Sequence, residues 1–186
     1  MTAIDKAFKE VKRANFLPKS VRLMAGFDSP IGIGHGQTNS QPTTVRMMLE
    51  WLDVQSDQKV LDVGSGSGWT TALLAHIVGP DGKVYAVERV PELLEFGRQN
   101  CAKLGLSNVE FSLARKTFGL PEYAPYDRIL VSASADKFPS EFVDQLKTGG
   151  KLVIPVQHSI LEVIKLPKAK IQTIDHPGFV FVPLIK

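Results

Sequence analysis

Cysteine is almost absent from this sequence, and long hydrophobic runs do not occur in it. The single cysteine, Cys101, cannot form an internal disulfide, which is typical of a reducing compartment. Because Cys101 falls within a helical pattern, we expect a buried structural thiol rather than a nucleophile. No stretch of about 18 apolar residues is present, and the first residues lack the apolar core of a signal peptide. These absences favour a cytoplasmic protein that does not engage a membrane.

The sequence also lacks a strong excess of charge of one sign. The 22 basic residues nearly balance the 19 acidic residues, for a net charge of +3, and no block of like charge stands out. Composition therefore indicates neither a nucleic-acid partner nor a membrane surface. Repeats and low-complexity segments are missing too, and 186 residues with 44% apolar content suit one hydrophobic core. We expect a monomer in which residues 1–186 form a single domain.

What the sequence does have is a strand-like apolar run, residues 60–63, that ends in glycines at alternate positions. Gly64, Gly66 and Gly68 allow tight turns and let backbone N–H groups approach a ligand. Helical composition follows over residues 70–75, so the order is strand, glycine loop and helix, as in a nucleotide-binding βα turn. A glycine-rich turn without a ligand is the alternative interpretation.

Two carboxylates narrow the choice of ligand class. Asp62 stands two residues before the first glycine, where it would repel a pyrophosphate and attract a cationic sulfonium. The spacing Asp-x-Gly-x-Gly-x-Gly is similar to the first motif of S-adenosylmethionine-dependent methyltransferases. Glu88 ends the β-rich run 83–88, about 20 residues after the loop, where nucleotide folds place an acid that binds ribose hydroxyls. A solvated strand end would also explain Glu88.

Strand and helix patterns alternate from Lys59 onward, which predicts an α/β fold with a doubly wound, mostly parallel sheet. Ligands in such sheets bind beyond the carboxyl ends of the strands, so Ser132, Ala133 and Ser134 are pocket candidates, although a plain polar turn would explain them equally well. We expect strands over 60–63, 84–87, 109–113, 128–132 and 151–156, helices over 69–78, 91–104 and 140–146, and two late strands over 160–166 and 179–185, antiparallel at the sheet edge.

Ahead of the sheet, residues 1–57 form a helical and loop segment that we expect to cover the cofactor pocket. Apolar residues at helical spacing predict helices over 4–11, with Thr2 and Asp5 as a cap, and over 45–53. Residues 26–42 read as a long irregular loop of small, hydroxyl and amide groups without a metal pattern. His35 in this loop is a structural histidine rather than a general base, and Ser40 could cap the helix that follows Pro42.

Six motifs along residues 26–184 together resemble the protein-L-isoaspartate O-methyltransferase family. In this sequence they are Ile33 to Ser40, Gly64 to Trp69, Glu88 to Leu93, Ala124 to Asp127, Leu146 to Gly150 and Val182 to Leu184. The resemblance implies a Rossmann-like class I methyltransferase fold. It also implies methyl transfer from S-adenosylmethionine to the free carboxylate of isoaspartyl residues in damaged proteins or peptides, as a step in protein repair.

By family position, the Ser40 hydroxyl lies at the substrate carboxylate and is the catalytic residue. No general base is needed, because a carboxylate is already deprotonated at neutral pH. The cofactor-binding residues implied by the resemblance are Thr38, Asn39, Gln41, Asp62, Gly64, Ser65, Gly66, Ser67, Gly68, Trp69, Glu88, Arg89, Ala114 and Arg115.

The sequence departs from the family at two positions. The usual Gly-Asp-Gly after the third strand is Ala114-Arg115-Lys116 here, which removes an acceptor for the adenine amino group and brings a second cation near a cationic cofactor. The family's Thr-Ile-Ser is Thr38-Asn39-Ser40. Two alternatives therefore stay open: a methyltransferase of the same fold with a changed acceptor, and a non-catalytic binding module.

Overall fold

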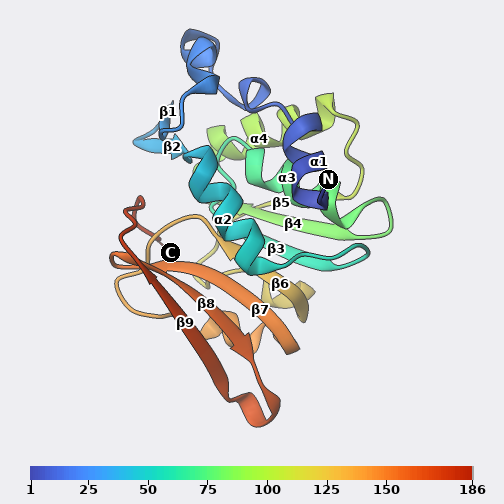
Figure 1. Ribbon diagram of the computed structural model, residues 1–186, viewed down its shortest axis with the longest axis vertical. Coiled ribbons are helices and arrows are strands. Elements are labelled where there is room, and N and C mark those ends of the chain that lie inside the picture. The colour runs from blue at the N-terminus through green and yellow to red at the C-terminus, as the bar shows by residue number, and fades with distance from the viewer. Residues whose placement is uncertain (186) are drawn as a thin grey trace.

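The computed structural model describes residues 1–185. Their central feature is a seven-stranded sheet with the strand order β5-β4-β3-β6-β7-β8-β9 (Figure 1). Strands β3 to β7 run parallel, and β8 and β9 continue the sheet antiparallel. Chain order reverses between the neighbours β3 and β6, which is where open α/β sheets bind ligands. The strands are β3 (Lys59–Val63), β4 (Lys83–Glu88), β5 (Val109–Leu113), β6 (Tyr126–Val131), β7 (Leu146–Val156), β8 (Ser159–Lys165) and β9 (Ile171–Pro177).

Successive side chains of the central strand β3 point to opposite faces of the sheet, so the hydrophobic core has two layers. Val60 joins the cluster under the larger helices, while Leu61 and Val63 join the cluster on the opposite face. The second face is covered by the short helix α5 (Glu141–Asp144), the 3₁₀ turn η3 (Pro121–Tyr123), the adjoining loops and Leu184. The larger helices are α1 (Ala3–Glu10), α2 (Pro42–Leu52), α3 (Trp69–Val78) and α4 (Pro91–Lys103).

Helix boundaries follow local chemistry. Thr2 and Asp5 form the expected capping box at the start of α1. Helix α2 begins at Pro42 and ends where Asp53 adopts a left-handed conformation. Ser40 does not cap α2, because Gln41 is the N-cap residue and makes no side-chain cap bond; the Asp28 carboxylate accepts from the Thr43 backbone N–H at 2.9 Å instead.

The prediction of an irregular loop over 26–42 is wrong for its second half. Residues 31–39 form an antiparallel hairpin, with β1 (Ile31–Gly34) paired to β2 (Gln37–Asn39). Gly34, His35 and Gly36 all have positive φ and make the turn. Ile31 and Ile33 alternate with glycines, so each buries its side chain while the intervening positions stay exposed.

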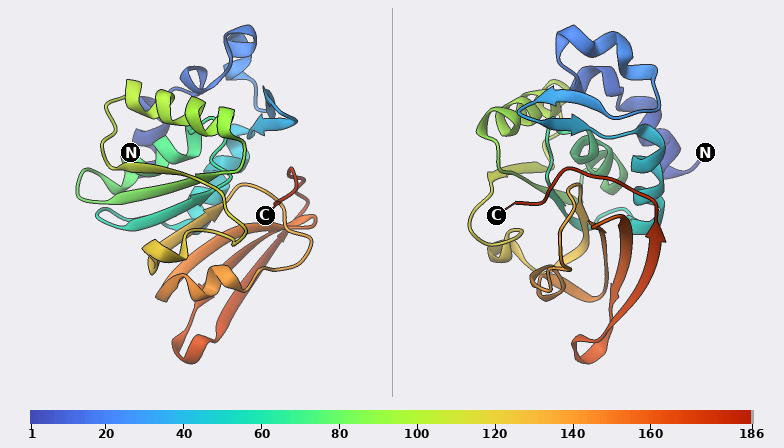
Figure 2. Two further views of the ribbon diagram at one scale, coloured as in Figure 1. Left: turned by 180° about the vertical axis from the view of Figure 1, so that it is seen from behind. Right: turned by 90° about the vertical axis from the view of Figure 1, so that its left-hand side faces the viewer.

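The second late strand was placed wrongly as well. The edge strand is β9, over Ile171–Pro177, whereas residues 179–185 form a run without regular secondary structure apart from one bridge between Pro183 and Ser134. This run crosses the carboxyl edge of the sheet below the β1–β2 hairpin (Figure 2, right). Over residues 1–185, no helix combines the length and apolar character needed to cross a membrane.

Candidate active site

The glycine loop after β3 is held in place by its neighbouring strand. The backbone N–H groups of Gly64 and Ser65 donate to the Val87 carbonyl at 2.8 and 3.1 Å. Gly64 and Gly66 have φ of +79° and +52°, so a side chain at either position would strain the backbone. The Ser65 hydroxyl is buried without a hydrogen-bond partner among the described residues. A polar atom in this position is suited to a ligand.

Glu88 fixes the loop as well as facing the pocket. One carboxylate oxygen accepts from the Gly66 N–H at 2.8 Å, and the other accepts from the N–H groups of Arg89 and Val90 at 2.8 and 3.0 Å. The side chain is only 5% exposed, so the alternative of a solvated strand end is excluded. Glu88 therefore joins the end of β4 to the glycine loop.

Asp62 lies beneath the loop rather than in the pocket. Its side chain is fully buried, and one oxygen accepts from the hydroxyls of Thr71 and Thr70 at 2.6 and 3.1 Å. Burial raises the pKa of Asp62 to about 6, although the two threonine hydrogen bonds oppose this shift. Asp62 does not line the cleft, which disagrees with the expectation of direct cofactor contact: one carboxylate oxygen anchors the start of α3, and the other is buried without a hydrogen-bond partner among the described residues.

The expectation that Gly68 touches the cofactor also disagrees with the structure, in which Gly68 packs against α4. Gly68 is the N-cap residue of α3 with φ of +86°, and a Cβ there would lie 3.0 Å from the backbone of Gly97 in α4. Gly68 is thus required for close packing of the loop on α4 and does not line the pocket. The next residue, Trp69, does line it, and its indole N–H donates to the Val11 carbonyl.

A cleft at the carboxyl edge brings most of the predicted residues together. The hairpin contributes one wall, the glycine loop and Glu88 contribute the floor, and the C-terminal run closes the far side. Ser132 and Ala133 line it as expected, whereas Ser134 instead donates from its hydroxyl to the Gln157 carbonyl. The predicted cofactor residues found in this cleft are Thr38, Asn39, Gly64, Ser65, Gly66, Ser67, Trp69, Glu88, Arg89 and Ala114.

Ser40 stands where this cleft meets a second, larger cavity. The second cavity measures about 640 Å³ and shares Thr38, Ser40, Ser132 and Val182 with the first. Its other walls come from α2 and from residues 178–182, and they present mainly neutral polar and apolar side chains. Gln41 lines only this second cavity, so the structure places it away from the expected cofactor cleft.

Arg115 does not enter the cleft, contrary to the expectation. Its guanidinium pairs with the Glu122 carboxylate at 3.0 Å, and its side chain is 71% exposed. Only Ala114 from this stretch lines the cleft. The substitution of the family's acidic residue therefore leaves an apolar wall and adds no cation to the site.

The remaining candidates have structural positions. His35 is exposed at the hairpin turn, outside both cavities. Cys101 is a buried thiol in α4, as expected, and burial raises its pKa to about 12, which makes it a poor nucleophile. Within residues 1–185, no cluster of three or more His, Cys, Asp or Glu side chains could hold a metal ion.

Two residues with no evident sequence signal are important for this site. The buried Arg13 donates to the carbonyls of Asn39 and Ser40 at 3.1 and 2.9 Å. Asp28 accepts from Thr43 and Gln41 at the start of α2, and these hydrogen bonds hold its pKa below the ordinary value. The hydrogen bonds of Arg13 and Asp28 join residues that lie 13 to 27 positions apart in the sequence, so no local sequence pattern predicts them.

The family model described as protein-L-isoaspartate (D-aspartate) O-methyltransferase matches residues 1–186. The chain belongs to this family. It is 46% identical over 185 residues to the protein-L-isoaspartate O-methyltransferase of Aeropyrum pernix, covering 97% of this chain and 71% of the relative. It is 44% identical over 177 residues to the Methanocella arvoryzae protein of the same name, covering 94% of each chain.

Solved structures of the same family agree. One protein-L-isoaspartate O-methyltransferase superposes with a TM-score of 0.91 at 28% identity and covers all of this chain, which spans 62% of that structure's length. The Plasmodium falciparum structure, titled a putative member of the family in complex with S-adenosyl-L-homocysteine, gives a TM-score of 0.84 at 25% identity. It covers all of this chain and 91% of its own. The predicted family and Rossmann-like methyltransferase fold are confirmed.

Proposed function

We propose that this chain transfers a methyl group from S-adenosylmethionine to the free carboxylate of isoaspartyl residues in damaged proteins or peptides. The observation that carries the proposal is the position of Ser40 at the junction of two cavities. One has the loop and carboxylate expected for a nucleoside cofactor, and the other is open enough for a peptide. Family membership supports the same assignment.

The residues of the first cavity suit this cofactor. Gly64 and Gly66 leave the backbone bare beside the unpartnered Ser65 hydroxyl, which matches a ligand with a polar methionine end. Glu88 retains acceptor capacity for ribose hydroxyls in addition to its backbone contacts. When bound, S-adenosylmethionine supplies a methyl group on a sulfonium, which is already an activated leaving group.

The second cavity suits a carboxylate acceptor within a peptide. An ionised carboxylate needs no base, and the walls of this cavity carry no histidine or acidic side chain among the residues that line it. In our proposal the Ser40 hydroxyl donates to the acceptor and holds it in line with the methyl group. Alignment of this kind, rather than proton transfer, supplies the acceleration.

The N-terminal segment 1–57 completes the site in this proposal. The hairpin supplies Thr38 and Asn39, Ser40 follows it directly, and α2 supplies a wall of the second cavity. The predictions that the protein is cytoplasmic and monomeric, and that it does not act on nucleic acid or membranes, stay predictions.

Two measurements on the purified protein test the proposed function. Calorimetry with S-adenosylhomocysteine should detect binding, and labelled methyl transfer should occur to an isoaspartyl peptide but not to its aspartyl twin. Binding without methylation of either peptide would favour a changed acceptor. Absence of binding at millimolar cofactor would favour the non-catalytic module, and either result would overturn the proposal.

A further inference from the structure

Arg13 is a buried cation with an unusually complete set of oxygen partners. It is 6% exposed, and its guanidinium donates to the Asn39 side-chain oxygen at 2.7 Å and to five backbone carbonyls. Those carbonyls belong to Ala25, Phe27, Ser29, Asn39 and Ser40, at 2.8 to 3.5 Å. These partners are all neutral oxygens from the segment that leads to Ser40, so peptide dipoles stabilise the charge together with the attraction of the nearby Asp28 carboxylate.

The same network reaches the glycine loop by two routes. The Asn39 amide, itself 5% exposed, donates to the Ser67 hydroxyl at 3.2 Å. The Arg13 guanidinium also lies over the ring of Trp69, 5.4 Å from its centroid. Both Ser67 and Trp69 line the cofactor cleft, so one buried side chain touches the Ser40 segment and, through Asn39 and Trp69, the loop that follows β3.

We propose that Arg13 and Asn39 are positioning residues that couple the Ser40 segment to the glycine loop, so that cofactor binding and acceptor binding strengthen each other. The inference rests on the proposed function for the identity of the acceptor. A cofactor that contacts Ser67 acts on Asn39 through their hydrogen bond, and Arg13 and Asn39 together hold the Ser40 segment that the acceptor meets. By linkage, the acceptor must tighten cofactor binding by the same factor.

The chain's departure from the family is what makes this link possible. An isoleucine at position 39, as in the family's Thr-Ile-Ser, could neither accept from Arg13 nor donate to Ser67. The substitution Asn39→Ile therefore removes the link while Arg13 keeps its backbone partners. Ser67→Ala removes the other end of the same hydrogen bond.

The test measures S-adenosylhomocysteine affinity by calorimetry, with and without an isoaspartyl peptide. We expect the peptide to tighten binding about fivefold in the wild-type protein, in the range of a typical coupling between sites. Either substitution should reduce this factor to about one. In the double-mutant cycle, Asn39→Ile and Ser67→Ala together should weaken binding no more than about twofold beyond the larger single effect.

Arg46→Gln is the matched control, because it removes an arginine contact to Asp5, at 2.8 Å, without touching either loop. It should leave the peptide effect unchanged. Arg13→Lys offers three donors in place of five and should abolish the coupling. If that variant does not fold, the double-mutant cycle of Asn39→Ile and Ser67→Ala still tests the link. Additive effects of the two substitutions on affinity would overturn the link. A wild-type protein that binds S-adenosylhomocysteine but not the peptide would instead contradict the proposed function, and the cycle would still test the Asn39–Ser67 contact.

Discussion

At the scale of single residues, Asp62 shows how a correct motif can contain an incorrectly assigned contact. The spacing of Asp62 before the glycines is similar to that in methyltransferases, and its charge suggested a direct partner for a sulfonium. The structure buries it under the loop with Thr70 and Thr71. Sequence spacing locates a residue along the strand but does not say whether its side chain points into the cleft or into α3.

Burial of Asp62 predicts a measurable pH dependence of stability. Its folded pKa, about 6, lies above the value of about 4 for an unfolded aspartate, so the folded state binds the extra proton. Its contribution to stability is therefore present below pH 4 and is lost as pH rises to 6. We expect the unfolding free energy of the wild-type protein to fall by on the order of 2–3 kcal/mol across this window relative to Asp62→Asn.

Urea unfolding at several pH values between 4 and 8 provides the measurement. The difference between the two proteins should change with pH and then level off above pH 7. A constant difference across the whole range would show that Asp62 keeps an ordinary pKa.

At the scale of elements, most of the sheet and the main helices could be predicted from periodicity, while the hairpin and the last strand could not. Helix α3 has the expected bounds, because a glycine loop precedes it and Gly79 follows it. In β1 only Ile31 and Ile33 are apolar, too few to reveal a strand beside three residues of positive φ. Strand β9 is exposed at nearly every position, so it lacks the alternation that marks a half-buried strand.

Contact between the glycine loop and α4 gives an element-scale prediction. A Cβ at Gly97 would lie 3.0 Å from the Gly66 carbonyl oxygen and 3.2 Å from the Gly68 nitrogen, both of them backbone atoms. Gly97→Ala should therefore push the loop away from α4, destabilise the protein by about 1–3 kcal/mol and weaken S-adenosylhomocysteine binding.

Gly26→Ala is its control, because a Cβ there meets nothing within 4 Å and the backbone does not have positive φ. Thermal unfolding and calorimetry on both variants make the comparison. If the Gly97 variant kept wild-type affinity, the loop would not depend on this close approach.

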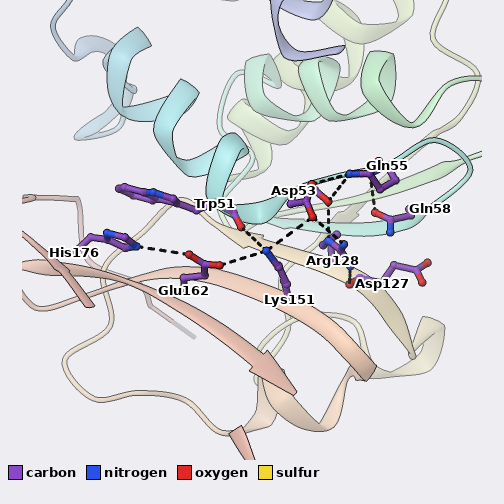
Figure 3. Close-up of polar contacts among 9 residues, drawn as sticks. All are labelled: Trp51, Asp53, Gln55, Gln58, Asp127, Arg128, Lys151, Glu162 and His176. Atoms are coloured by element: carbon purple, nitrogen blue, oxygen red, sulfur yellow. Dashed lines mark hydrogen bonds and ion pairs between the residues drawn. The ribbon is translucent and has the colours of Figure 1, made fainter. Parts of the chain in front are cut away.

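At the scale of the whole molecule, a charged network fastens the end of α2 to the sheet (Figure 3). The Lys151 ammonium lies 3.3 Å from the Glu162 carboxylate and 3.4 Å from the Trp51 carbonyl. The Trp51 ring stacks on His176 at 3.9 Å, and His176 in turn lies 3.7 Å from Glu162. Since α2 and residues 178–182 both line the larger cavity, this network ties together two segments of its wall.

Removal of the Lys151 ammonium should lower the free energy of unfolding. In Lys151→Met the largely buried Glu162 carboxylate loses its ammonium partner, and we expect a loss of about 2–4 kcal/mol in unfolding free energy. Lys147→Met, on the same strand but in an exposed pair with Asp127, should cost about 1 kcal/mol or less. Equal losses in urea unfolding would mean that the network adds nothing beyond a surface ion pair.

The central claim is that Ser40, where the two cavities meet, holds the acceptor carboxylate for methyl transfer. The most direct measurement is single-turnover methylation of an isoaspartyl peptide by Ser40→Ala at saturating S-adenosylmethionine, beside calorimetry with S-adenosylhomocysteine. We predict a methyl-transfer rate about tenfold to a hundredfold below wild type, with cofactor affinity changed by no more than about twofold. An unchanged rate, or a loss of affinity as large as the loss of rate, would contradict the account.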